Sequence, residues 1–492
     1  MTGPRHATSA SSERNTSGCR EWNDTGIGGK YTADGPASVG AKAATSLYGD
    51  RLHLQDFHLD LIVTRRSLTS FRSLVPLAVV LLGACTAVSE HAGADAANGQ
   101  GGSAGVGASS AATPVATADS ARNGVTTTVS AGADTTAGTA QNRTVAPLDV
   151  DKEFPYVRAL YVNRWASQSS KRMKEIIRIA DETEINGVVI DMKDEFGLNY
   201  HPSNPTWARN GGNAGVIRNL PALLDTLRAH HILPIARIVV FKDSVTARVH
   251  PEWTIRQKDG SIWRDKKGLA WVNPYHHELW QYNIGIAEEL AKMGFGEVQF
   301  DYIRFPEPYP SLPTQVFPEQ NGVGKPEVLA NFLKNANARL DKVGARTTAD
   351  IFGLVTTVGG PLEVGQWWEK LAPVTDVLLP MVYPSHYPSG SFGIKHPNAE
   401  PYQIIKIALT KAHERNEKLG ITGVGHVRPY LQAFTLGAPH YGPEQIRAQK
   451  QATYDSGFDG WVLWNPGSKY EEFLPALEKT MESKKVAVAP KP

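Results

Sequence analysis

The sequence has few cysteines and almost no excess charge of either sign. Its two cysteines, Cys19 and Cys85, both precede the part of the chain that is rich in large apolar residues. A structural disulfide or a cysteine-ligated zinc site is therefore excluded from that part. Lysine and arginine total 51, and aspartate and glutamate total 49. This balance gives no electrostatic reason to expect nucleic acid as a partner.

The most apolar stretch near the start of the sequence is too short to span a membrane. The stretch RRSLTSFRSLVPLAVVLLGAC (65–85) contains an apolar run of about eleven residues, too short for a transmembrane helix. Its basic start and its Leu-Gly-Ala-Cys end resemble a bacterial lipoprotein signal peptide, in which the cysteine is diacylated. We therefore expect residues 63–85 to be a signal peptide that ends at a lipidated Cys85. The protein would then be exported and anchored in the bacterial cell envelope, meeting the membrane only through its lipid.

Two other interpretations of this stretch stay open. One is an ordinary signal peptide with an incidental cysteine, and the other is a twin-arginine export signal that starts at Arg65-Arg66. Because signal peptides begin near the initiator, residues 1–62 are predicted to be disordered or to lie upstream of a true start near Val63.

Composition divides the remainder of the chain. Residues 86–152 are mostly Ala, Gly, Ser and Thr, and lack the large apolar side chains that offset the entropy of ordering, so they are predicted to be a disordered linker. From 153 to 480 aromatic and β-branched residues recur, which indicates one folded domain. Residues 481–492 are predicted to be a disordered tail.

Within 153–480, short apolar runs alternate with segments of helical periodicity. Continuous apolar runs are typical of parallel strands that are covered on both faces. The predicted strands lie at 156–163, 185–194, 232–243, 295–305, 345–353, 375–384, 421–431 and 458–467. The predicted helices lie at 169–184, 219–231, 275–294, 327–344, 364–373, 401–420, 442–457 and 471–484. Eight of each predict a (β/α)₈ TIM barrel. A doubly wound open sheet would need a glycine-rich turn after its first strand, and YVNRWASQSS (161–170) has no glycine.

Polar side chains stand at the end of each predicted strand. In a barrel of this kind the active site lies at the carboxyl ends of the strands, so these side chains should share one rim. We expect Asp301 and Asp350, on neighbouring strands, to be catalytic. The residues expected to bind substrate are Asp191, Lys193, Asp194, Arg237, Arg304, Tyr383, Arg428, Gln432, Trp464 and Asn465.

These residue types fit glycoside hydrolysis. One carboxylate attacks the sugar or activates water, and a second, protonated carboxyl donates a proton to the leaving oxygen. A nearby cation such as Arg237, Arg304 or Lys193 would keep one of the two ionised. Tyr383 and Trp464 offer flat faces to sugar rings. Each residue also has a structural alternative, such as an ion pair between Asp191 and Lys193.

The motifs INGVVIDMKDEFG, VQFDYIRFP, ADIFG, VLLPMVYPSHY, RPYLQAF and GWVLWNPG, in this order, resemble a bacterial family of domains of unknown function that is placed among the TIM-barrel glycosyl hydrolases. The resemblance covers about 156–477 and implies a (β/α)₈ fold and carbohydrate breakdown. In related barrels of the α-amylase type a nucleophilic Asp ends the fourth strand, where Asp301 stands. Those enzymes carry a Glu as the acid on the fifth strand, where this chain has Asp350. The proton donor is therefore open among Asp350, Asp194, Glu195 and Glu307.

The leading hypothesis is a glycoside hydrolase that acts on a polysaccharide or oligosaccharide. The alternatives are a catalytically inactive glycan-binding barrel of the cell envelope, and a lyase or aldolase for phosphorylated metabolites. The last would need a phosphate cradle after strands seven and eight, of which only fragments are present. The pairs His230-His231 and His276-His277 are adjacent, so on a helix they face different ways. We expect no metal and no cofactor.

Overall fold

The structure is a computed structural model that describes residues 145–422 and 426–480. The predicted N-terminal extension, the signal peptide with Cys85, most of the linker and the C-terminal tail lie outside these residues.

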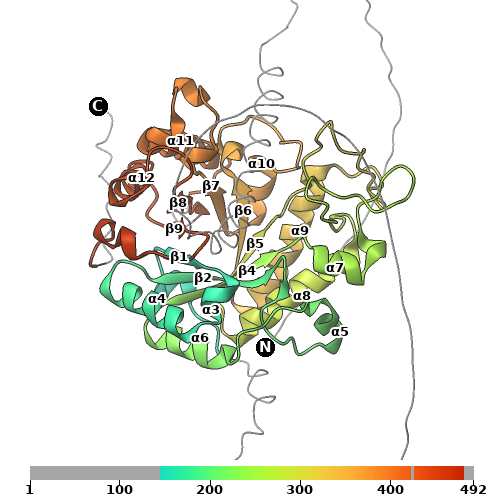
Figure 1. The fold of residues 1–492 in the computed structure, drawn as a ribbon, viewed down its shortest axis with the longest axis horizontal. Coiled ribbons are helices and arrows are strands. Elements are labelled where there is room, and N and C mark those ends of the chain that lie inside the picture. Colours follow the sequence, from blue (N-terminus) through green and yellow to red (C-terminus); the bar gives the residue numbers. More distant parts are fainter. Residues whose placement is uncertain (1–144, 423–425, 481–492) are drawn as a thin grey trace, which may run out of the picture.

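Eight parallel strands form a closed barrel at the centre of the molecule (Figure 1). Each strand pairs with the strand before and after it in the chain order, and β1 pairs with both β2 and β9, which closes the ring. The eight strands are β1 Arg158–Val162, β2 Gly187–Asp194, β4 Leu233–Val239, β5 Glu297–Asp301, β6 Arg346–Phe352, β7 Val377–Met381, β8 Tyr430–Gln432 and β9 Trp461–Trp464. A two-residue strand, β3 (Gly197–Leu198), extends β2 antiparallel. The predicted barrel is confirmed, and the open-sheet alternative is wrong.

Helices follow the strands along the chain, and the longer ones cover the outside of the barrel (Figure 1). They are α3 Arg164–Ser167, α4 Ser170–Glu182, α5 Pro205–Ala208, α6 Leu220–Ala229, α7 Ser244–Val249, α8 His277–Met293, α9 Lys325–Leu340, α10 Trp368–Leu371, α11 Pro401–Lys418 and α12 Pro443–Asp455. The predicted last helix is wrong in type. Residues Glu471–Ala476 form a 3₁₀ helix that contains Pro475, and a proline inside a helix removes a backbone donor and clashes with the preceding turn.

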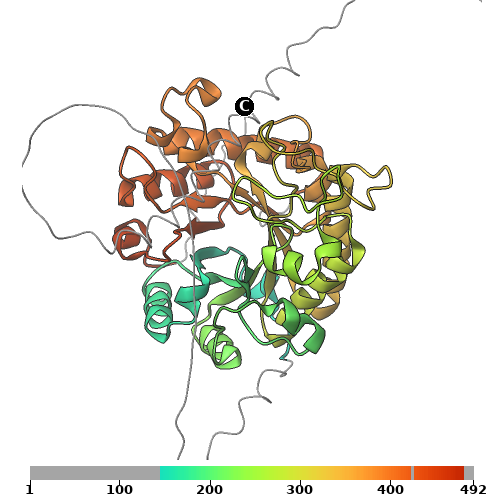
Figure 2. The same ribbon diagram turned by 45° about the vertical axis from the view of Figure 1, so that its right-hand side comes forward.

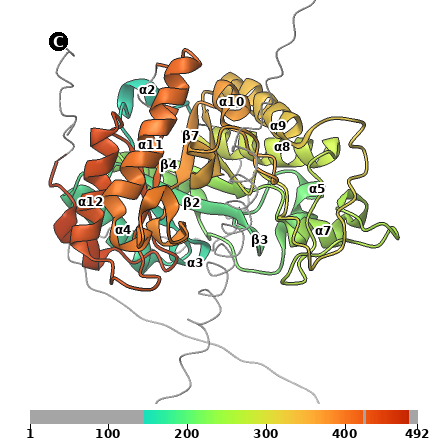
Figure 3. The ribbon, with the colours of Figure 1, turned by 90° about the horizontal axis from the view of Figure 1, so that it is seen from above.

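The amino-terminal end of the barrel is closed by residues that were predicted to belong to the linker. Helix α2 (Val150–Glu153) is capped by Asp149, and Val150 is buried with Phe154 and Leu233. Figure 3 shows α2 and α3 at opposite ends of the barrel. The ordered domain therefore begins before residue 153, because Leu148 and Val150 supply apolar side chains that cover the barrel floor.

A long insertion separates β4 from α8. It contains α7 and then a ribbon of antiparallel bridges, in which Thr254 pairs with Val272, Arg256 with Ile262, and Arg264 with Ala270. Trp253, Trp263 and Trp271 are buried within or beneath it. The insertion lies on the side that comes forward in Figure 2.

Side chains alternate between the barrel interior and the helical layer, as the period of two along a strand requires. In β5, Val298 and Phe300 pack in the larger apolar cluster with the helices, whereas Glu297, Gln299 and Asp301 face inward. Glu297 meets Arg428 at the floor, Gln299 meets Tyr430 at mid-height, and Asp301 meets Arg237 at the mouth. The interior is therefore layered, and its polar upper layer opens at the carboxyl ends of the strands.

Candidate active site

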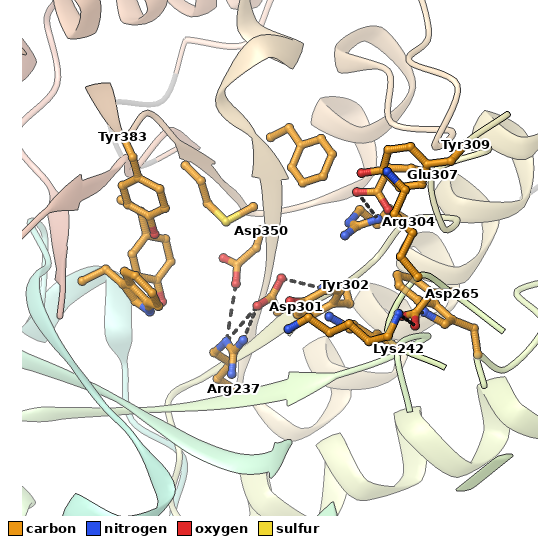
Figure 4. A pocket seen from close by; sticks show the side chains of 17 residues that line it. Arg237, Lys242, Asp265, Asp301, Tyr302, Arg304, Glu307, Tyr309, Asp350 and Tyr383 are labelled. Carbon is orange, nitrogen blue, oxygen red and sulfur yellow. Dashed lines mark hydrogen bonds and ion pairs between the residues drawn. The ribbon is translucent and has the colours of Figure 1, made fainter. Parts of the chain in front are cut away.

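A pocket opens at the carboxyl ends of the strands, and its walls bound about 880 Å³ of space that is open to solvent. Figure 4 shows its side chains converging from β4, β5, β6 and the loops that follow them. The lining residues are Arg237, Lys242, Asp265, Lys266, Lys267, Trp271, Asp301, Tyr302, Arg304, Glu307, Tyr309, Asp350, Phe352, Met381, Tyr383, Tyr430 and Trp464.

Arg237 joins three carboxylates at the base of this pocket. Its Nε donates to Oδ2 of Asp301 at 3.0 Å and lies 3.9 Å from Oδ2 of Asp350, and its Nη1 pairs with Asp191. Since both distances start from one nitrogen, the Asp301 and Asp350 oxygens are at most about 7 Å apart, the sum of the two. Two carboxyls therefore lie close together at one mouth of the barrel.

The environments of these two carboxyls differ. Burial raises the pKa of Asp350 well above its ordinary value, and the nearby charge of Asp301 raises it further. Gln299 Nε2 donates to Asp350 Oδ2 at 2.9 Å, while Oδ1 accepts no hydrogen bond from any residue in the described part of the chain. Asp301 has direct hydrogen bonds from the Arg237 guanidinium, which stabilise its charged form. The two carboxyls therefore differ: the raised pKa of Asp350 favours its protonated form, and Asp301 is the carboxyl that Arg237 contacts closely.

Asp191 holds the arginine from the other side. Its Oδ2 accepts a hydrogen bond from the Tyr161 hydroxyl at 2.5 Å, and its Oδ1 pairs with Arg237. Burial raises the pKa of Asp191, although the Arg237 charge acts in the opposite direction. Asp191 does not line the pocket, so it orients Arg237 rather than meeting a ligand.

Tyr302, directly after Asp301, has a φ of 51°, in the left-handed region that side chains other than glycine rarely adopt. Such backbone strain concentrates at functional sites. Here it ends β5 abruptly and places Tyr302 beside Asp301 in the pocket wall (Figure 4).

Aromatic rings form the wall of the pocket that lies away from Arg304 (Figure 4). Trp464 lies 5.6 Å from Tyr383 and 5.9 Å from Tyr161, measured between ring centroids. Burial raises the pKa of Tyr383 and of Tyr430, so both hydroxyls stay protonated and can donate hydrogen bonds. This wall offers apolar faces beside the carboxyl pair.

The structure brings seven of the twelve predicted catalytic and substrate-binding residues to this constellation. Six line the pocket, and Asp191 lies behind Arg237; the six are Asp301, Asp350, Arg237, Arg304, Tyr383 and Trp464. The other five lie elsewhere, and the prediction that they bind substrate is wrong.

Lys193 and Asp194 serve the structure around β2. The pairing of β2 with β4 shifts between Asp191 and Lys193, and this irregularity turns Lys193 away from the pocket. Lys193 is buried against Asp243, with Nζ 2.6 Å from its Oδ2. Asp194 accepts three hydrogen bonds from the buried Arg164. Neither side chain is available to a ligand.

Arg428 lies at the wrong end of the barrel for a substrate contact. It was expected at the end of a strand, but β8 begins only at Tyr430, so Arg428 stands before the strand. Its guanidinium forms a bidentate ion pair with Glu297, at 2.6 and 2.9 Å. Arg428 therefore stabilises the barrel floor.

Gln432 and Asn465 hold loops. Gln432 accepts from the Ser385 backbone and donates to the Phe434 carbonyl at 3.0 Å. Asn465 donates to the Ala433 carbonyl and accepts from the Gly467 and Lys469 backbones. Their polar groups are used within the protein.

The other candidate proton donors also include one residue that lines the pocket and two that do not. Glu307 lines the pocket, but it pairs with Arg304 at 3.2 Å. Asp194 is held by Arg164, and Glu195 is exposed in the turn between β2 and β3. Asp350 is the carboxyl that combines burial, a raised pKa and proximity to Asp301.

Several residues around the site were not predicted, among them Tyr161, Gln299 and Tyr430. Gln299 stands two residues before Asp301 on β5, and Tyr161 lies on β1, facing inward. Both could have been predicted from the two-residue period along each strand, which turns alternate side chains toward the barrel interior. Lys266, Lys267 and Trp271 were missed because their positions depend on how the β4–α8 insertion folds over the mouth.

Two further searches of the described residues gave negative results. No group of three or more His, Cys, Asp and Glu side chains in 145–422 and 426–480 is arranged to hold a metal ion. No helix in these ranges is both long enough and apolar enough to cross a bilayer.

Comparisons with known proteins show the family to which the chain is similar. A family model described as "Putative glycosyl hydrolase domain" matches residues 159–470. No curated protein matches the chain.

Among the solved structures that match, one reaches a TM-score of 0.50. The glycoside hydrolase domain of PgaB (BpsB) from Bordetella bronchiseptica is 14% identical over 67% of this chain and 100% of its own, with a TM-score of 0.50. A hypothetical protein from Ruminiclostridium thermocellum is 34% identical over 39% of this chain and 96% of its own, with a TM-score of 0.36. An α-L-fucosidase from Paenibacillus thiaminolyticus is 14% identical over 65% and 48%, with a TM-score of 0.44.

Proposed function

We propose that this chain, which belongs to the family of putative glycosyl hydrolase domains whose model it matches, hydrolyses a glycosidic bond with Asp301 and Asp350. The observation that carries the proposal is the carboxyl pair itself. Two acids on neighbouring strands approach one arginine within 3.0 and 3.9 Å, and only one of them forms close hydrogen bonds with it.

In this mechanism Asp350 is the general acid. Its raised pKa keeps a proton on the carboxyl to higher pH than an ordinary aspartate would, as a general acid requires. It protonates the oxygen of the leaving sugar as the bond to the anomeric carbon breaks.

Asp301 acts on the anomeric carbon. Its carboxylate, held by Arg237, either attacks the carbon directly, forming a glycosyl ester that water then hydrolyses with Asp350 as the base, or removes a proton from an attacking water. The upper limit of about 7 Å on the oxygen separation allows the retaining geometry and excludes all but the lower end of the inverting range. Arg237 stabilises the charge of Asp301 throughout.

The substrate is a polysaccharide or oligosaccharide. Trp464 and Tyr383 offer ring faces, on which a sugar presents its apolar C–H groups, and Tyr430 offers a hydroxyl donor. We also propose that the domain acts in the cell envelope, tethered through Cys85. Labelling of the wild type, but not of Cys85→Ser, by a fatty-acid probe in cells would support the tether, and equal labelling would refute it.

Hydrolysis is tested by measuring reducing ends released from a broad panel of polysaccharides. We expect release by the wild type, release by Asp225→Asn, which changes an exposed carboxylate on α6, and loss of activity in Asp301→Asn and Asp350→Asn. Glu307→Gln identifies the acid, because loss of activity there with retention in Asp350→Asn would reassign the role. If the wild type cleaves no member but binds one, the glycan-binding alternative replaces this proposal.

A further inference from the structure

Two exposed aromatic side chains meet on the rim of the barrel, outside the pocket. Trp165, on α3, is 55% exposed, and Phe196, in the turn between β2 and β3, is 43% exposed. Their ring centroids lie 5.6 Å apart, and the rings meet edge to face at 60°. Exposed apolar side chains that stand singly need no explanation, whereas contiguous ones indicate a binding surface.

A buried ion pair holds the two rings together from beneath. Arg164, the residue before Trp165, donates three hydrogen bonds to the Asp194 carboxylate and another to the Gly197 carbonyl. Asp194 also accepts a hydrogen bond from the Phe196 backbone N–H at 2.9 Å. Because breaking a buried ion pair is strongly destabilising, the two rings are fixed in one arrangement.

Glycines fix the same turn from its other side. A Cβ atom at Gly197, where φ is 100°, would overlap the Gly211 carbonyl, and one at Gly212, where φ is 70°, would overlap the Phe196 carbonyl. Backbone therefore packs directly on backbone here, in a conformation that favours glycine. The exposed Phe196 ring stands on a rigid support.

The pair continues the aromatic wall of the pocket around the rim. Strands β9, β1 and β2 are neighbours in the barrel, and Trp464, Trp165 and Phe196 stand at or just beyond their carboxyl ends. The Asn163 side chain ties the start of α3 to the loop after Trp464, because it donates to the Pro466 carbonyl at 2.8 Å. Figure 3 shows α3 and β3 at the same end of the barrel. The three rings therefore follow one arc, from the pocket across the β1–β2 side of the mouth.

The turn that carries Phe196 lies on the Tyr161 side of the pocket. Burial raises the pKa of the Tyr161 hydroxyl well above its ordinary value, and the charge of Glu195, next to Phe196, is among those that raise it further. The Tyr161 ring in turn lies 5.9 Å from that of Trp464, in the pocket wall.

We infer that Trp165 and Phe196 form a distal sugar-binding platform, so that the substrate is a long glycan chain that runs from the carboxyl pair across the β1–β2 side of the mouth. The inference rests on the proposed function and specifies the length of its substrate. Tryptophan combines a large apolar face with a polar edge, which suits a sugar ring that is apolar on one face and polar at its rim. Two rings are too small a surface for a stable protein partner, which needs about 800 Å² on each side.

Binding is tested by native electrophoresis through gels that each contain one soluble polysaccharide: glycol chitin, glycol chitosan, xylan, glucomannan, dextran or alginate. Asp301→Asn is the parent protein, so that the polymer is not cleaved during the run. We expect at least one polymer to retard the parent, and Trp165→Ala/Phe196→Ala in the parent to weaken binding to that polymer about tenfold. Trp165→Phe keeps a ring face and should keep most of the binding.

Tyr402→Ala is the matched control, because Tyr402 is also exposed but lies on α11, where its hydroxyl bonds to Asp455 on α12. Thermal unfolding should give the same Tm for every variant as for the parent, since the atoms removed are exposed. No retardation by any of these polymers, equal retardation of the parent and the double variant, or an equal loss in Tyr402→Ala would overturn the inference.

Turnover separates this inference from the proposed function. In the otherwise wild-type protein, Trp165→Ala/Phe196→Ala should lower kcat/KM about tenfold on the polymer and leave it unchanged on a trisaccharide from the same polymer. An unchanged kcat/KM on both would overturn the platform and leave the hydrolase in place. Retardation that depends on the two rings, without any turnover, would support the platform and overturn the hydrolase.

Discussion

Replacing Arg237 by methionine removes the cation that three buried carboxylates share. Methionine keeps an unbranched side chain in place but leaves Asp191, Asp301 and Asp350 without their common partner. Removing one partner of a buried ion pair destabilises a protein by about 3–5 kcal/mol. With an unfolding entropy of about 2.1 cal/mol/K per residue over roughly 330 residues, this corresponds to a fall in Tm of about 4–7 °C.

The loss should depend on pH in a defined direction. The pKa values of Asp191 and Asp350 are raised in the folded protein, so their contribution to stability is full below the unfolded value of about 3.9 and is lost as pH rises through the folded pKa. The Arg237 charge lowers both pKa values, so its removal raises them further. The difference in stability between wild type and Arg237→Met should therefore be small near pH 4 and grow toward pH 8.

Thermal unfolding followed by circular dichroism across this range measures the effect. Adding Asp350→Asn to Arg237→Met removes one of the stranded carboxylates, and the double variant should regain part of the loss at pH 8. A difference in Tm that is the same at pH 4 and pH 8, or no recovery in the double variant, would refute the electrostatic reasoning.

Two further predictions concern Asp350 and the barrel floor. Gln299→Leu removes the hydrogen bond that lowers the pKa of Asp350. The basic limb of the profile of kcat/KM against pH should therefore move up by about one pH unit. A limb that stays in place or moves to lower pH would contradict the role of Asp350 as the acid. Arg428→Met leaves Glu297 buried without its bidentate partner. The free energy of unfolding, measured in urea, should therefore fall by about 3–5 kcal/mol while kcat/KM of the folded enzyme is unchanged. A selective loss of activity would place Arg428 at the active site.

The parts of the site that could be predicted are those that strand geometry determines. Asp301, Arg237 and Asp350 follow from apolar strands that end in polar residues, because parallel strands bring their carboxyl ends to one rim. The alternation along β5 also explains Gln299, two residues before Asp301.

The errors arose where local irregularity changed the position of a side chain. The shift in pairing between Asp191 and Lys193 reverses the side on which Lys193 lies, and the late start of β8 moves Arg428 to the floor. Lys266 and Lys267 depend on a long insertion whose path over the mouth is set by tertiary packing of Trp263 and Trp271 rather than by strand periodicity.

The most direct test of the carboxyl pair compares glycosides that have good and poor leaving groups, once the panel has identified the sugar. A dinitrophenyl leaving group needs no proton, so Asp350→Asn should retain most of the wild-type kcat on a dinitrophenyl glycoside and lose it on the natural glycan, while Asp301→Asn should lose both. Equal loss on both substrates in Asp350→Asn, or retained activity in Asp301→Asn, would contradict the assignment of acid and nucleophile or base.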